Sequence, residues 1–264
     1  MSEPLLLRND VGPISHLTLN SPRNLNALSD AMIAALQAEF DQLAEDRAQK
    51  VIILKGAGRA FCAGHDLKEM QAARQSPDNG ATAWGDLFAR CSKLMQTIPR
   101  LPQPVIAQVH GLAAAAGCQL VASCDLAVAA DDAKFGVNGV NIGLFCSTPM
   151  VALSRVMPRK QMFEMLTTGE FLSAARAREV GLINRVGAPD ALADATQGLA
   201  QNIATKLGSA VRIGKRAFYQ QAELTLAEAY ALTGAVMVDN MLNAQTDEGI
   251  NAFLEKRPPN WPDA

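Results

Sequence analysis

The sequence predicts an α/β fold, with a mainly parallel sheet followed by a helical C-terminal region. Short apolar runs rich in β-branched residues alternate with amphipathic helical segments, which is the pattern of consecutive βαβ units. From about Ser147 onward the pattern becomes almost wholly helical. The chain has 264 residues, 49% of them apolar, which suits one α/β domain with a helical extension. We therefore predict a core over residues 1–200 and a helical region over 201–264.

The predicted strands are short and apolar. Ile14 to Asn20 alternates between apolar and polar residues, and Val51 to Leu54 reads as a buried strand. Two further strands are expected at Pro104 to Val109 and at Asp125 to Ala130. Because helical patterns separate these runs, the strands should pair in parallel.

The predicted helices follow from apolar residues at helical spacing. Ser29 is the expected N-cap of the first, and Gly181 and Gly208 are expected C-caps later in the chain. The others are expected over 66–74, 84–98, 116–123, 148–156, 159–167, 173–180, 189–207, 209–222, 225–241 and 245–256.

Charge and cysteine usage exclude several classes of protein. The formal net charge of −2 provides no general attraction for nucleic acid or anionic lipid. Five cysteines without a CxxC pair suggest neither a disulfide framework nor a metal site, which favours a cytoplasmic location. The apolar run Leu5 to Leu7 is too short to span a membrane.

A dinucleotide-binding loop is also excluded. Gly56 and Gly58 follow a predicted strand, as a phosphate-binding loop would. The third glycine of that motif would fall at the position of Phe61, whose side chain blocks close approach of the backbone to a phosphate.

Two segments carry the strongest chemical signal, Arg59 to Lys68 and Val109 to Asp125. Each passes from a strand end through small residues into a helix, which leaves backbone N–H groups free to point into a cleft. Two such donors from different loops can hold one carbonyl oxygen. When negative charge develops on that oxygen, each donor is worth roughly 100- to 1,000-fold in rate.

These segments resemble the crotonase (enoyl-CoA hydratase/isomerase) superfamily. The motifs that carry the resemblance extend along nearly the whole chain, at Pro22–Leu28, Phe61–Asp66, Gly117–Leu120, Cys124–Asp125, Leu166–Gly169, Ala174–Gly181 and Gly249–Arg257. Gly64–Glu69 and Gly143–Pro149 are most similar to the subgroup called enoyl-CoA hydratase domain-containing protein 3. The resemblance implies a crotonase-type spiral of ββα units whose C-terminal helices pack between subunits, in a homotrimer or a dimer of trimers. It also implies an acyl-CoA thioester ligand, with coenzyme A as part of the substrate and no separate cofactor or metal.

By resemblance, the backbone N–H groups of His65 and Ala116 are the oxyanion donors. The family has glycine where Ala116 stands, and an N–H donor survives that change if φ stays negative. Ala114 and Ala115 similarly replace a glycine-rich run, which should stiffen the loop.

The two glutamates that move protons in a hydratase of this family are missing. One activates water and the other handles the proton at the α-carbon, and their positions here are Gln119 and Gly139. Each such group typically contributes about 100- to 10,000-fold, so standard hydration should be strongly impaired. Asn138, Asn141 and the His65 side chain are possible substitutes. Cys146 is another, because it precedes a predicted helix N-terminus, where the pKa of a thiol can fall.

The resemblance also indicates residues that contact substrate or coenzyme A. These are Arg23, Leu25, Ala63, Gly64, Asp66, Leu67, Lys68, Gly117, Phe253 and Lys256. Simpler interpretations stand beside this one: Asp66 as a helix N-cap, the basic residues as solvated charges, Cys146 as a packing residue, and His110 and Asp125 in structural roles.

Three functions remain open at this point. The first is an enzyme of the enoyl-CoA hydratase type, and the second is an isomerase or thioester hydrolase, which needs less proton-transfer machinery. The third, which the missing glutamates motivate, is a non-catalytic regulatory protein that binds acyl-CoA.

Overall fold

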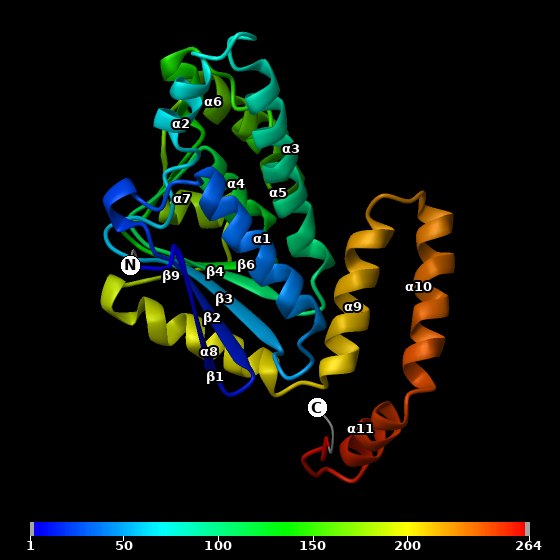
Figure 1. Cartoon of the computed structure of the whole chain (residues 1–264). Helices are drawn as coiled ribbons and strands as arrows, with labels where there is room; N and C mark the ends of the chain where they lie inside the picture. The colour runs from blue at the N-terminus through cyan, green and yellow to red at the C-terminus, as the bar shows by residue number, and fades with distance from the viewer. Residues whose placement is uncertain (1–2, 262–264) are drawn as a thin grey trace.

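The computed structural model describes residues 3–261 and contains a six-stranded sheet in the order β1-β2-β3-β4-β6-β9 (Figure 1). The sheet strands are β1 (Leu6–Val11), β2 (Ile14–Leu19), β3 (Val51–Gly56), β4 (Val105–Val109), β6 (Leu126–Ala130) and β9 (Arg185–Gly187). All neighbouring pairs are parallel except β1 with β2, which confirms the mainly parallel sheet. The sequence analysis did not predict β1 or β9.

A second, three-stranded sheet was not predicted at all. It contains β5 (Leu112–Ala114), β7 (Lys134–Gly136) and β8 (Leu172–Ser173), in that order. These strands have two or three residues each, too few to show a period of two in the sequence.

The helices agree closely with the predicted ranges. They are α1 (Asp30–Glu45), α2 (Leu67–Ala73), α3 (Ala81–Thr97), α4 (Ala116–Ser123), α5 (Pro149–Val156), α6 (Arg159–Thr168), α7 (Ala174–Glu179), α8 (Leu192–Ala204), α9 (Gly208–Gln221), α10 (Leu226–Met241) and α11 (Ala244–Leu254). The Ser29 hydroxyl accepts a hydrogen bond from Met32 N at 3.2 Å and caps α1, as predicted. Gly181 follows the end of α7 at φ +83°. The Gly208 prediction is wrong, because this residue begins α9 instead of ending α8.

Helices cover both faces of the larger sheet. Figure 1 shows α8 below it and α1, α3 and α4 above it. Residues of β3 alternate accordingly: Ile53 packs in the cluster under α8, whereas Ile52 and Leu54 pack in the main core on the other side. This two-sided burial explains why the strand is a continuous apolar run in the sequence.

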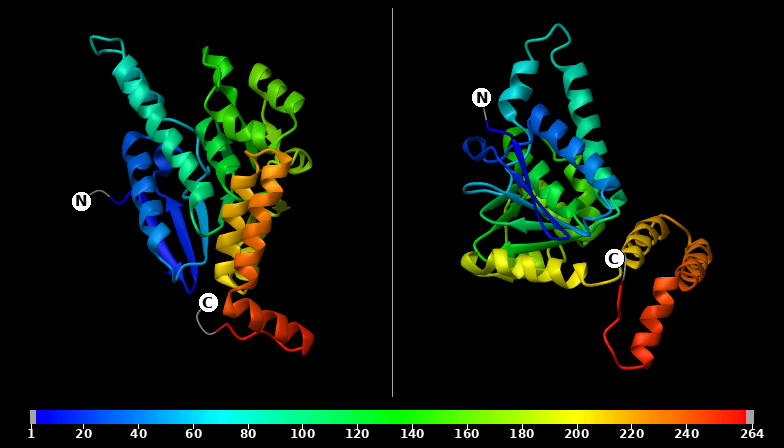
Figure 2. Two further views of the ribbon diagram at one scale, coloured as in Figure 1. Left: turned by 90° about the vertical axis from the view of Figure 1, so that its right-hand side faces the viewer. Right: turned by 60° about the horizontal axis from the view of Figure 1, so that its bottom comes forward.

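The C-terminal helices lie beside the core, and both views of Figure 2 show α11 projecting beyond it. A buried ion pair attaches α9 to the core: Lys215 Nζ lies 2.6 Å from Asp125 Oδ2 and also donates to the carbonyls of Ile98 and Gln103. Asp125 in turn accepts hydrogen bonds from Val105 N and from the Tyr219 hydroxyl. The predicted structural role of Asp125 is confirmed.

Candidate functional site

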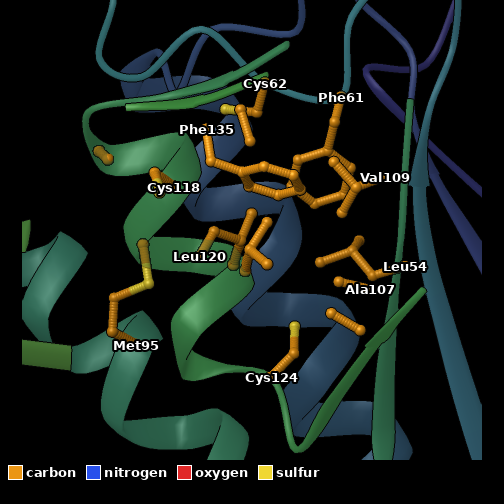
Figure 3. Packing of buried hydrophobic residues seen from close by; sticks show 14 of the residues in the cluster. Leu54, Phe61, Cys62, Met95, Ala107, Val109, Cys118, Leu120, Cys124 and Phe135 are labelled. Atoms are coloured by element: carbon orange, nitrogen blue, oxygen red, sulfur yellow. The ribbon is translucent and has the colours of Figure 1, made fainter. Parts of the chain in front are cut away.

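The two chemically important segments lie side by side at the carboxyl ends of β3 and β4. Cys62 and Ala113 form a parallel bridge between them. Cys62 N donates to Leu112 O at 3.1 Å, and Ala114 N donates to Cys62 O at 3.0 Å. Figure 3 shows the apolar packing beneath this junction, to which Phe61, Phe135 and Cys118 of α4 contribute. The apolar packing thereby fixes the position of both loops.

Two glycines permit this close approach. A Cβ at Gly117 would lie 2.2 Å from Cys62 O, so no side chain fits where α4 packs on the neighbouring segment. Gly64 has φ +96°, and a Cβ there would lie 3.3 Å from Ala116 N. Both glycines are therefore required by the geometry, and the loop that contains His65 lies against the first residue of α4.

The predicted oxyanion donors both have free N–H groups. Within residues 3–261, neither the N–H of His65 nor that of Ala116 has a hydrogen-bond partner. Ala116 is the first residue of α4 and is not among the residues with positive φ. The sequence analysis required a negative φ for an alanine to keep this N–H donor, and that requirement is met. The helix dipole of α4 adds positive potential at the same point.

Ala115, immediately before this donor, has an unfavourable backbone conformation. Its φ is 49° and its ψ is −118°, a combination that glycine adopts readily and alanine does not. Its N–H donates to Gly136 O at 2.8 Å, which helps to hold the conformation. The sequence indicated a stiffer loop here but gave no sign of this strain.

The turn before α1 supports the His65 loop from the other side. Leu28 N donates to Gly64 O at 2.7 Å, and Ala63 N donates to Leu25 O at 3.0 Å. The buried Asn26 side chain stabilises the turn through Ser21 N, Ala57 O and Ala60 O. Sequence reasoning did not single out Asn26, although a buried asparagine inside a resemblance motif could have indicated such a role.

The His65 imidazole lies beside the donor formed by its own N–H. It meets Phe88 of α3 edge to face, with ring centroids 5.8 Å apart. Burial lowers the pKa of His65, so the ring is neutral near pH 7. Both ring nitrogens are buried, and within the described residues neither makes a hydrogen bond of good geometry, although the Leu28 backbone lies close enough to oppose part of the pKa shift. Phe88 lies in the helix predicted over 84–98, and the sequence analysis did not single it out as a neighbour of the site.

Gln119 lies one helical turn after Ala116. Its side chain is 4% exposed, and Oε1 has no partner in the part of the chain that the structure describes. Because side chains of a helix lean toward its N-terminus, the amide extends over the turn that carries the Ala116 N–H. An unpaired buried amide costs about 1–3 kcal/mol, which a polar ligand group or a water would recover.

Gly139 has no space for a side chain. A Cβ at this position would lie 2.5 Å from Leu144 O and 2.8 Å from Cys146 Sγ. The turn that follows, whose Leu144 N donates to Gly139 O, therefore fills the space that a side chain at this position would occupy.

The other residues considered for proton transfer differ in burial. Burial raises the pKa of Cys146. This contradicts the low-pKa thiol considered from the sequence and agrees with a packing role. Asn138 is half-buried, and Asn141 is exposed with its side chain against Gly169.

The predicted coenzyme A contacts fall into two groups. Leu25, Ala63 and Asp66 lie around the oxyanion loops, where Asp66 caps α2 by accepting from Lys68 N at 2.8 Å. Arg23, Leu67 and Lys68 are exposed at the same end of the molecule.

Phe253 lies in α11 and Lys256 follows it, and Figure 1 shows α11 at the opposite end of the molecule from α2. One subunit does not bring these two residues to the oxyanion loops, and their role stays a prediction. His110 Nε2 lies 2.8 Å from Gly58 O, which agrees with the structural role predicted for it.

Comparison with known proteins gives a consistent result. Residues 11–264 match the family model described as Enoyl-CoA hydratase/isomerase. The chain is 47% identical over 248 residues to human "Enoyl-CoA hydratase domain-containing protein 3, mitochondrial", covering 94% of this chain and 80% of that protein. A crystal structure of an enoyl-CoA hydratase from Mycobacterium smegmatis has a TM-score of 0.94 and 54% identity, covering 98% and 99% of the two chains. The crystal structure of the human domain-containing protein 3 has a TM-score of 0.92 and 44% identity, covering 97% of this chain and 100% of that one.

The predicted cytoplasmic location is contradicted by these relatives. The human, rat and Xenopus laevis proteins are all named as mitochondrial. The cysteine pattern indicates only a reducing environment and does not specify a compartment, so the prediction went further than its evidence. No helix among residues 3–261 is long and apolar enough to cross a membrane.

Proposed function

The chain belongs to the enoyl-CoA hydratase/isomerase family, and on that premise we propose that it binds an acyl-CoA thioester and polarises its carbonyl between two backbone donors. The observation that carries this proposal is the pair of free N–H groups at His65 and Ala116, on loops held together by the Cys62–Ala113 bridge. Donors fixed in this way need no reorganisation when charge develops on the carbonyl oxygen.

Enoyl-CoA hydration is the nominal reaction, and we expect it to be strongly attenuated. Gln119 cannot exchange a proton, and Gly139 lies against Leu144 O and Cys146 Sγ, so neither position supplies a carboxylate. Losing both groups removes two contributions of about 100- to 10,000-fold each. Acyl-CoA binding with little hydration is therefore the function that the geometry supports best.

A second candidate is a reaction that needs one proton-transfer group, such as double-bond isomerisation or thioester hydrolysis. The neutral His65 imidazole, with both nitrogens unpaired beside the oxyanion donor, favours it. Incubation with 3-enoyl-CoA and with acyl-CoA would separate the two reactions through a shifted double bond or a released thiol. Turnover that disappears in His65→Ala supports this candidate, and turnover that survives excludes the imidazole.

A homotrimer or dimer of trimers is part of the same proposal. Large apolar side chains on the C-terminal helices are exposed, with Leu242 at 79% and Phe253 at 80%, and α10 has no buried residue. A neighbouring subunit that covers these helices would also allow Phe253 and Lys256 to reach the acyl-CoA site of another subunit. Light scattering that gives the mass of a monomer would refute this part.

Binding of the thioester is tested by comparing two variants at one position. His65→Pro removes both the imidazole and the N–H donor, and Gly64 can precede a proline because it has no side chain. His65→Ala removes the imidazole alone. We expect calorimetry with a short saturated acyl-CoA to show weaker binding by about 3- to 10-fold for His65→Pro relative to His65→Ala, the worth of one hydrogen bond.

Free coenzyme A and thermal unfolding provide the controls. Free coenzyme A should show no such difference between the two variants, since it lacks the carbonyl, and unfolding curves establish that both variants are folded. Equal acyl-CoA affinity for His65→Pro and His65→Ala, or no binding to the wild type, would contradict the proposal.

A further inference from the structure

A small crevice lies at the end of the sheet strands opposite to the oxyanion loops. It is formed where the chain enters β3 and β4, and its third wall is α9 and the end of α8. The lining residues are Gln49, Lys50, Pro102, Gln103, Ile203, Gly208, Val211 and Arg212. Because the oxyanion loops follow the carboxyl ends of these strands and the crevice precedes their amino ends, the two sites are separate.

Cations gather at this crevice without an acidic partner. Lys50 and Arg212 approach each other over Gly208: a Cβ at Gly208 would lie 3.1 Å from Arg212 Nη1 and 3.8 Å from Lys50 Cε. Arg47 is close enough to lower the pKa of Arg212, after the larger effect of burial. Burial, followed by Arg212, lowers the pKa of Lys50. Among the described residues, none of the three cations has a carboxylate within 4.0 Å.

The first turn of α9 adds further hydrogen-bond donors. Leu207 precedes this 14-residue helix, and no side chain caps it. Its first turn contains no acidic residue. Val211 N bonds back to Leu207 O, so the N–H groups of residues 208–210 precede the first intrahelical bond. These N–H groups and the helix dipole attract negative charge to the point where Lys50 and Arg212 meet.

Two buried glutamines line the same crevice, and each has an unpaired acceptor. Gln49 is 7% exposed and Gln103 is 2% exposed. Their amide nitrogens donate to backbone carbonyls, Gln49 to Gly12 O and Gln103 to Leu43 O and Asp46 O. Oε1 of each has no partner within residues 3–261. The crevice as a whole has room for about one water-sized group, so a group that enters it should donate hydrogen bonds to these oxygens.

We propose that this crevice binds inorganic phosphate, which keeps a P–O–H near pH 7. The hydroxyl enters the crevice and donates to the glutamine oxygens, and the charged oxygens lie outside it against Lys50, Arg212 and the first turn of α9. The ligand needs both negative charge and a hydrogen-bond donor. The cations attract the negative charge, and the glutamine oxygens accept the hydrogen bond. Sulfate satisfies only the first requirement, since it has no proton near pH 7.

The ligand would connect the α/β core with the C-terminal helices, because Gln49, Lys50 and Gln103 belong to the core and Gly208 and Arg212 to α9. A group that binds only the folded state raises the unfolding midpoint in proportion to the logarithm of its concentration. Occupancy is therefore measurable as stability, independently of any acyl-CoA chemistry.

The experiment is a thermal unfolding titration of the full chain at constant ionic strength. Inorganic phosphate, glycerol phosphate, sulfate and chloride are compared, and calorimetry gives the affinity. We expect a saturable rise in midpoint with inorganic phosphate, a smaller rise with sulfate and none with chloride. Glycerol phosphate is a second control: its second pKa is about 6, so it has no P–O–H near pH 7 and should raise the midpoint no more than sulfate does, and a rise equal to that with inorganic phosphate would contradict the proposal.

Two variants on one helix make the test specific. Arg212→Gln should weaken phosphate binding about tenfold or more, since it removes a charge-assisted contact. Arg216→Gln, four residues further along α9 and exposed, removes the same charge outside the crevice and should bind as the wild type does. Three results would each overturn the proposal. Sulfate could raise the midpoint as much as phosphate does, the two variants could lose phosphate affinity equally, or phosphate could have no saturable effect on the wild type. The last result would mean that the crevice holds only water.

Discussion

Introducing a carboxyl group at Gln119 should produce measurable hydration, whereas introducing one at Gly139 should not. Gln119→Glu places a carboxyl one helical turn after the Ala116 donor, in a position that is 4% exposed in the wild type. Burial raises the pKa of such a carboxyl and brings it closer to the range useful for proton transfer. One general acid–base group contributes about 100- to 10,000-fold, so we expect a gain near the lower limit, roughly 100-fold.

Gly139→Glu differs because the structure leaves no room for it. The new Cβ would lie 2.5 Å from Leu144 O, a backbone atom, and 2.8 Å from Cys146 Sγ. Forcing extra atoms into packed space typically costs about 1–3 kcal/mol of unfolding free energy. The double variant Gln119→Glu with Gly139→Glu should therefore hydrate no faster than Gln119→Glu alone, and its unfolding midpoint should fall by a few degrees.

The assay is loss of the conjugated thioester absorbance of a short 2-enoyl-CoA, with unfolding curves recorded for every variant. Gln119→Met, similar in size and unable to exchange protons, is the matched control and should not exceed the wild type. A double variant that keeps the wild-type midpoint and gains a further 100-fold in rate would refute the claim that the turn at Leu144 and Cys146 closes the second position.

Three further predictions concern stability. Lys215→Met leaves the Asp125 carboxylate buried without its cation, which should lower the unfolding free energy by about 3–5 kcal/mol in a chemical denaturation experiment; a loss under 1 kcal/mol would contradict it. Ala115→Gly relieves a backbone strain of about 1–3 kcal/mol at the cost of some chain entropy, so denaturation should show a net gain of about 1 kcal/mol, and a clear destabilisation would show that φ 49° is not strained. Burial lowers the pKa of His65 below its usual 6.5 in the folded state, so the unfolded state binds more protons and stability falls as pH drops from 6.5 toward the folded pKa. His65→Gln should reduce that slope by at most about 1.4 kcal/mol per pH unit, leaving the part due to His16, whose pKa burial also lowers; an unchanged slope would contradict the assignment.

Local periodicity was sufficient for the long elements of this fold. The helices over 116–123 and 225–241 were predicted nearly residue by residue, because an amphipathic or capped helix contains its own signal. The short strands β5, β7 and β8 lack such a signal, since their hydrogen bonds come from partners distant in the chain. One helix end at Gly208 was placed on the wrong side of the turn, because glycine occurs at both ends of helices.

The sequence by itself determined the α/β class, the family likeness and the presence of Gln119 and Gly139 where the resemblance predicts the two proton-moving glutamates, because these depend on residue identity and order. Only the tertiary structure decided that Gly139 is closed by Leu144 and Cys146, that Ala115 is strained beside the free N–H of Ala116, and that Lys50 and Arg212 meet at the start of α9. These features depend on packing distances, on backbone angles and on contacts between charges 162 positions apart in the chain. They arise only when the chain folds, so no local sequence pattern predicts them.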